Sequence, residues 1–104
     1  MTTEDFNALV EETYREFKET LCTKANQYAN CDDRLANFKD AAKFLDVDPK
    51  QALWGFVTKH IIALNDFIQL DTSPSEQQWC EKTGDIICYM ILLRGLLVDE
   101  GAIM

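Results

Sequence analysis

The stretch DPKQALWGFVTKHIIALNDFIQL (residues 48–70) decides the fold of this chain. Its start is marked for a helix by Asp48, which can cap, by Pro49 at the first helical position, and by Gln51, which can reach back to the cap. Apolar side chains then recur at steps of three and four residues, which predicts a helix with one broad apolar stripe. The stripe comprises Leu53, Phe56, Val57, His60, Ile61, Leu64, Phe67 and Ile68.

His60 falls inside this stripe, with Lys59 beside it and Asp66 less than two turns later. Two interpretations remain open. In the first, His60 is a neutral core histidine that hydrogen-bonds a neighbour. In the second, it is a ligand contact, and Lys59 supplies positive charge to a bound nucleotide.

Length and composition indicate a single domain over residues 1–104 with one modest hydrophobic core. The net charge is -8, from 18 acidic and 10 basic side chains. This balance argues against direct binding of nucleic acid, because gripping phosphates requires basic patches. It permits a divalent cation or a basic protein partner.

The four cysteines form no CxxC pair, and the chain has one histidine, so a structural zinc site is not expected. We expect free thiols in a reducing compartment. The N-terminus is acidic and lacks the apolar run of a signal peptide. The longest apolar stretch, residues 86–93, is far too short to span a bilayer. A cytoplasmic location is therefore expected.

Three further helices are predicted around the central one, which gives an all-α fold of four helices in a compact bundle with short links. The first begins after Thr2 or Thr3, with acids in its first turn. The second covers Arg34 to Leu45, capped by Asp32 or Asp33. The last is expected from Pro74 to about Glu100, because Ser73, Pro74 and Glu76 form a start signal and Gly101 an end signal.

The start of the second helix is a candidate anion site, since a helix N-terminus presents free N–H groups and a partial positive charge. Lys24, Arg34 and Lys39 would gather near it. An ordinary capping loop explains the same residues equally well.

Paired carboxylates on two helices are candidates for a Mg²⁺ site. Glu12 and Glu16 are four residues apart in the first helix, and Glu81 and Asp85 are four apart in the last. Each pair shares one side of its helix. Mg²⁺ takes one or two carboxylates together with substrate phosphates and waters. Acids at this spacing also arise by chance in an acid-rich helical chain.

Three segments together resemble a family of small phage-encoded helical proteins, a branch of the MazG-like, nucleotide-modification-associated proteins. They are KANQYANCDDRLANFKDAA, DPKQALWGFVTKHIIAL and EKTGDIICYMILLRGLL, and the resemblance covers roughly residues 20–98. The family pattern is Lys-x-x-Asp-Tyr, then Asp-Arg followed by Asn-Phe, then Lys-His, then Asp-x-x-Asn-Tyr. The positions that match it are Lys24, Tyr28, Asp33, Arg34, Asn37, Phe38, Lys59, His60, Asp85 and Tyr89.

The chain departs from this pattern at two positions. Gln27 replaces an aspartate, and Cys88 replaces an asparagine. MazG-like enzymes also arrange their acids as Glu-Glu-x-x-Glu and Glu-x-x-Asp, whereas the pairs of this chain are spaced more widely. These departures leave open whether catalysis is retained.

The resemblance implies a nucleotide-handling protein with possible Mg²⁺-dependent hydrolysis of a nucleoside triphosphate by a metal-activated water. In this hypothesis the nucleotide contacts are Lys24, Tyr28, Arg34, Asn37, Lys59, His60 and Tyr89, and the Mg²⁺ ligands are Glu81, Asp85, Glu12 and Glu16. The alternative is a non-enzymatic phage anti-defence protein. It would act in the host bacterial cytoplasm, where it would inhibit an immune system by binding a host protein or by sequestering a nucleotide signal.

A homo-oligomer is also expected. Trp54 and Ile62 lie off the main stripe of the central helix, so this helix is expected to be contacted on more than one side. A short chain with wide apolar faces often completes its core against a copy of itself.

Overall fold

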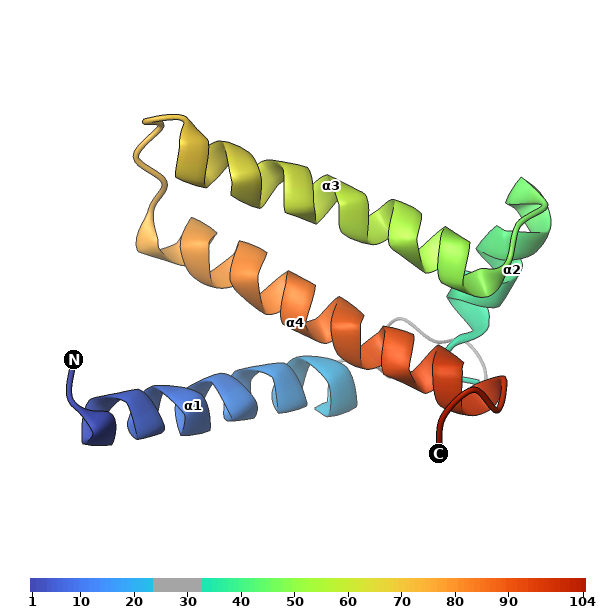
Figure 1. The fold of residues 1–104 in the computed structure, drawn as a ribbon, viewed down its shortest axis with the longest axis horizontal. Coiled ribbons are helices and arrows are strands. Elements are labelled where there is room, and N and C mark those ends of the chain that lie inside the picture. The colour runs from blue at the N-terminus through green and yellow to red at the C-terminus, as the bar shows by residue number, and fades with distance from the viewer. Residues whose placement is uncertain (24–32) are drawn as a thin grey trace.

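The computed structural model describes residues 1–23 and 33–104, and all regular structure in these ranges is helical (Figure 1). The all-α fold predicted from the sequence is confirmed. The elements are α1 (Thr3–Lys18), the π-helical segment η1 (Glu19–Thr23), α2 (Ala36–Leu45), α3 (Pro49–Gln69) and α4 (Glu76–Asp99).

The start of α3 is the one that the sequence predicts. The side chain of Asp48 accepts from the backbone N–H of Lys50 at 2.9 Å, and Gln51 Oε1 accepts from the backbone N–H of Asp48 at 3.0 Å. Pro49 occupies the first helical position, where its missing N–H leaves no donor unpaired. These bonds satisfy free backbone groups at the helix start and fix where α3 begins.

The predicted start of α4 is wrong by two residues. Ser75 is the cap: its hydroxyl accepts from the backbone N–H of Gln78 at 3.1 Å, and Gln78 reaches back to Ser75 at 2.8 Å. Ser73, the predicted cap, has a φ of 48°, so the chain turns there through the left-handed region. The reciprocal pair of Ser75 and Gln78 satisfies two helix-start donors, and this pair sets the boundary.

The starts of α1 and α2 are also fixed locally. Thr2 caps α1 by accepting from Asp5 N–H at 3.0 Å. Asp33 Oδ1 accepts from Leu35 N–H at 2.9 Å, and α2 begins at Ala36 rather than at the predicted Arg34. Because the side chain of Asp33 is bonded within this turn, Arg34 precedes the helix instead of forming its first residue.

The helices form a layer with α4 in the middle (Figure 1). α3 runs antiparallel to α4 on one side, and α1 runs in the same direction as α4 on the other side. α2 is short and packs on α3 at one end of the layer. The buried core lies at this end and consists of Phe38, Ala42, Ala52, Leu53, Val57 and Leu96. α1 contributes no buried residue.

Two ion pairs tie the end of α4 to the neighbouring elements. Lys50 Nζ lies 2.6 Å from a carboxylate oxygen of Glu100, which joins the start of α3 to the end of α4. Lys39 Nζ lies 2.6 Å from Asp33 and 2.8 Å from Asp99. Lys39 therefore holds the turn before α2 against α4.

The cluster of Asp33, Lys39 and Asp99 predicts a pH dependence. The hydrogen bond from Lys39, followed by that from Leu35 N–H, lowers the pKa of Asp33 below its ordinary 3.8, and the bonds to Asp33 and Asp99 raise the pKa of Lys39. A lowered carboxyl pKa gives stability that is present above the ordinary pKa and is lost as the pH falls through the folded value. A raised lysine pKa gives stability that is present below the ordinary pKa and is lost only in strong base.

We therefore expect Lys39→Gln to lower the thermal midpoint slightly at pH 7, because exposed ion pairs are weak. The difference in thermal midpoint between the variant and wild type should shrink as the pH falls below the pKa of the Asp33 carboxyl. Thermal unfolding followed by circular dichroism between pH 7 and pH 2.5 measures it. An equal difference at both ends of this range would contradict the assignment.

No helix in the described ranges is both long enough and apolar enough to cross a membrane.

Candidate functional site

A pocket of about 410 Å³ lies where η1, the start of α2, and parts of α3 and α4 meet. We call it the α2–α4 pocket. Its lining residues are Thr20, Leu21, Arg34, Asn37, Phe38, Phe56, Asp85, Cys88, Tyr89 and Leu92. They come from segments far apart in the sequence, so the pocket exists only in the folded chain.

Aromatic rings form much of the pocket wall. The rings of Phe38 and Phe56 meet edge to face, with centroids 6.0 Å apart and planes at 69°. Phe38 is also part of the buried core, which holds this wall in place. Tyr89 adds a third ring from α4. Such a wall suits a flat, apolar or heteroaromatic ligand group.

Arg34 supplies positive charge to this pocket. Its Nε is buried and has no hydrogen-bond partner in the part of the chain that the structure describes. The turn that carries Arg34 is held on both sides: Asp33 is bonded to Lys39, and Leu35 packs over Gly95 of α4. A buried donor without a partner costs about 1–3 kcal/mol, more for a charged group, so this nitrogen is poised to bond an anionic ligand.

His60 lies behind the pocket, in the seam between α3 and α4. Its Nδ1 is 3.4 Å from Asp85 Oδ2, and its ring centroid is 5.1 Å from that of Tyr89. The distance to Asp85 exceeds that of a good hydrogen bond, and Nδ1 has no hydrogen-bond partner in the described residues. His60 does not line the pocket itself, but it contacts two residues that do.

The thiol of Cys88 and the phenol of Tyr89, both on α4 at this pocket, are held neutral. Burial, followed by the charge of Asp85, raises the pKa of Cys88 and that of Tyr89. Arg34 pulls the pKa of Cys88 in the opposite direction with a smaller effect. At neutral pH Cys88 is therefore a thiol, and it lacks the thiolate that a cysteine nucleophile needs.

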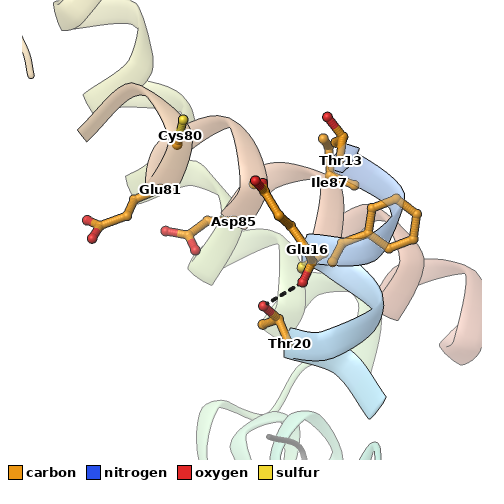
Figure 2. Close-up of a pocket in the computed structure, with 10 residues that line it drawn as sticks. Thr13, Glu16, Thr20, Cys80, Glu81, Asp85 and Ile87 are labelled. Atoms are coloured by element: carbon orange, nitrogen blue, oxygen red, sulfur yellow. Dashed lines mark hydrogen bonds between the residues drawn. The ribbon is translucent and has the colours of Figure 1, made fainter. Parts of the chain in front are cut away.

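A second pocket, of about 170 Å³, lies between α1 and α4 and contains three of the four predicted Mg²⁺ ligands. Figure 2 shows Glu81 and Asp85 projecting from α4 and Glu16 reaching across from α1. Asp85 lines this α1–α4 pocket and the α2–α4 pocket alike. Glu81 also accepts a hydrogen bond from Gln77 at 3.1 Å.

Glu12, the fourth predicted ligand, does not line this pocket. It lines an adjoining hollow with Glu16, which belongs to both, and with Glu76. Within residues 1–23 and 33–104, no three His, Cys, Asp or Glu side chains come close enough to hold a metal ion by themselves. Protein side chains of these ranges thus offer no ready-made metal cage, and a Mg²⁺ ion here would depend on ligand phosphates for much of its coordination.

The predicted nucleotide contacts divide into three groups. Arg34, Asn37 and Tyr89 line one pocket, with His60 behind them. Lys59 is exposed and lines none of the three pockets described above. Lys24 and Tyr28, and also Gln27, lie outside the described residues. The structure therefore brings together residues that are separated by more than 50 positions in the sequence.

Sequence reasoning missed Phe56 and Thr20 as pocket residues. Phe56 was assigned to the core stripe of α3, but it is 39% exposed and faces the pocket. Its position one turn before His60 was the available signal. Thr20 bonds back to the carbonyl of Glu16 at 3.1 Å, which directs this residue of η1 to the junction of both pockets (Figure 2). No local pattern predicts that.

Comparison of the chain with protein-family models, with curated proteins and with solved structures finds no match.

Proposed function

We propose that this chain binds a nucleotide or a nucleotide-derived signal in the α2–α4 pocket. The observation that carries the proposal is the buried, unpartnered Nε of Arg34 beside a wall of aromatic rings. A guanidinium is well suited to phosphate, because its planar set of N–H donors matches phosphate oxygens. Aromatic faces are well suited to a nucleotide base, since every kind of base has a flat face that can stack on them.

The size and polarity of the pocket support the proposal. Its volume of about 410 Å³ falls within the range of roughly 300–1,000 Å³ that is usual for small-molecule sites. Asn37 adds a polar amide side chain to this lining. The resemblance to MazG-like phage proteins points to the same ligand class, and Arg34, Asn37 and Tyr89 are among the residues that carry it.

Hydrolysis is the first extension of this function. Asp85 lines the pocket that holds Arg34, and Glu81 lies one turn before it. In this extension the carboxylate of Asp85 would share a Mg²⁺ ion with the phosphates of a nucleoside triphosphate. The ion would supply an activated water. The role of the chain's own residues would be to orient the phosphates through Arg34 and the base through the aromatic wall.

Sequestration without turnover is the second candidate function. Two observations favour it: the described residues contain no three-ligand metal group, and the neutral thiol of Cys88 stands where the related pattern has an asparagine. A phage anti-defence protein of this kind would hold a nucleotide signal without changing it. Its charge of -8 also suits a basic host protein as partner.

A thermal-shift panel of nucleoside mono-, di- and triphosphates and cyclic nucleotides, with and without Mg²⁺, tests the proposal. A ligand at 100 times its dissociation constant should add about 2.7 kcal/mol of stability. A shift that requires Mg²⁺ and a triphosphate supports hydrolysis, which a pyrophosphate-release assay then checks. A shift without metal supports sequestration. If no nucleotide shifts the midpoint at millimolar concentration, the proposal is wrong.

A further inference from the structure

α3 carries a stripe of large apolar side chains that the described chain covers only in part. Trp54, Ile61 and Ile68 are spaced seven residues apart and are 53%, 39% and 65% exposed. Residues at this spacing lie on the same side of a helix, and a seven-residue apolar repeat is typical of a helix that packs along another helix. The stripe lies beside the row that faces α4, because Trp54 follows the buried Leu53 and Ile61 follows His60.

α1 carries a comparable stripe. Phe6, Val10 and Tyr14 are spaced four residues apart and are 54%, 50% and 47% exposed. Here too, the exposed row lies one residue beyond the row that faces α4. The α1 residues that line hollows against α4 are Leu9, Glu12, Thr13, Glu16 and Phe17, and Thr20 of η1 continues this row.

Both stripes turn toward the same face of the layer. A step of one residue rotates the side chain by about 100° round a right-handed helix. α1 and α3 flank α4 on opposite sides and run in opposite directions (Figure 1), so the same rotation brings both rows to one face. On this face Trp54 and Leu93 of α4 line a shallow hollow of about 490 Å³ with Lys50 and Gln51. We call this surface the open face.

The open face and the α2–α4 pocket lie on opposite sides of the layer. Phe56, which lines the pocket, comes two residues after Trp54 and therefore points to the other flank of α3. The two features are independent, and covering one leaves the other accessible.

We propose that the open face binds a second copy of this chain and forms a symmetric dimer. Two chains of charge -8 can approach closely only through a surface with few acids. Between Trp54 and Ile68 the one acid is Asp66, two residues before Ile68 and therefore on the opposite flank. A partner recognised by charge would instead bind the acidic sides of the helices.

The available area also fits a dimer. The chain extends 43 Å by 30 Å along its two longest axes, and a standard interface needs only about 800 Å² from each partner.

Two adjacent isoleucines give a matched test. Ile61 is the central residue of the α3 stripe, so in an antiparallel dimer Ile61→Glu places two carboxylates near the two-fold axis. Ile62 is 57% exposed and points away from the open face, and Ile62→Glu adds the same charge at the next position. Light scattering after size exclusion should give twice the chain mass of 11.9 kDa for wild type and Ile62→Glu. Ile61→Glu should show a twofold lower mass.

Two results would overturn the proposal: a monomeric wild type at 100 µM and above, or equal masses for the two variants. Circular dichroism must show that Ile61→Glu remains helical. If it does not, Ile68→Glu replaces it, because Ile68 is 65% exposed in the single chain and a charge there leaves the isolated fold intact. A dimeric Ile68→Glu protein would then count against the open face as the interface.

Discussion

Leu53→Ala is expected to cost about 2–5 kcal/mol of unfolding free energy. Leu53 is 0% exposed and packs with Phe38, Val57 and Leu96 in the buried cluster at the α2 end. Removing its side chain deletes apolar contacts and leaves a cavity among residues that come from three helices. The surrounding structure relaxes only partly into such a cavity, so the loss exceeds that of the apolar contacts alone.

The matched control for this prediction is Leu45→Ala. Leu45 is 64% exposed at the end of α2, so the same chemical change there should alter stability by less than about 0.5 kcal/mol. Urea unfolding at constant protein concentration compares the two variants with wild type. The protein must be above the concentration at which it associates, since association raises the apparent stability. A similar loss in both variants would show that the core does not lie where the structure places it.

Arg34→Gln is expected to weaken nucleotide binding by about 10- to 150-fold, because a hydrogen bond to a charged group contributes roughly 1.5–3 kcal/mol. The same substitution should leave the unfolding free energy unchanged or slightly higher. The Nε of Arg34 has no hydrogen-bond partner in the described residues, so removing the guanidinium also removes a buried, unsatisfied donor. A residue with a purely structural role would give the reverse pattern.

Titration calorimetry with the nucleotide that gives the largest thermal shift measures this loss, and inorganic pyrophosphate serves as a phosphate-only comparison. Arg15→Gln is the control, because Arg15 is an exposed arginine of α1 that lines none of the described pockets. Equal affinity of the Arg34 variant and the control would place the ligand elsewhere. A large loss of stability in the Arg34 variant would assign the side chain to the fold instead.

Local signals predicted the helices well because each signal acts within a few residues. Asp48, Pro49 and Gln51 form a cap whose partners all lie in the same turn, and the structure contains the predicted bonds. The prediction of where α4 starts was wrong for a related reason. Two serines compete there, and the choice of Ser75 depends on which one pairs with the residue three positions later.

The candidate site was only partly predictable. The resemblance selected Arg34, Asn37 and Tyr89 without stating that they meet, and the structure places all three at one pocket. The carboxylate pairs show that spacing along a helix predicts which side chains share a side, but not which pocket that side faces. Glu12 and Glu16 share a side of α1, yet Glu16 lines a pocket with Asp85, and Glu12 does not. The rotation of α1 against α4 decides this, and it depends on packing across the whole layer.

Because the buried core lies at one end of the molecule, we expect that end to resist local unfolding more than the other end. The buried side chains, and the ion pairs of Lys39 and Lys50, lie where α2 meets the start of α3 and the end of α4. At the other end, the tips of α3 and α4 meet through partly exposed contacts such as that of Phe67 with Trp79. Local unfolding in an isolated chain would therefore begin at the turn around Ser73, where α3 and α4 would separate first, and proceed toward α2. The α2–α4 pocket shares Phe38 with the buried core, so we expect the pocket to keep its shape while the opposite end opens.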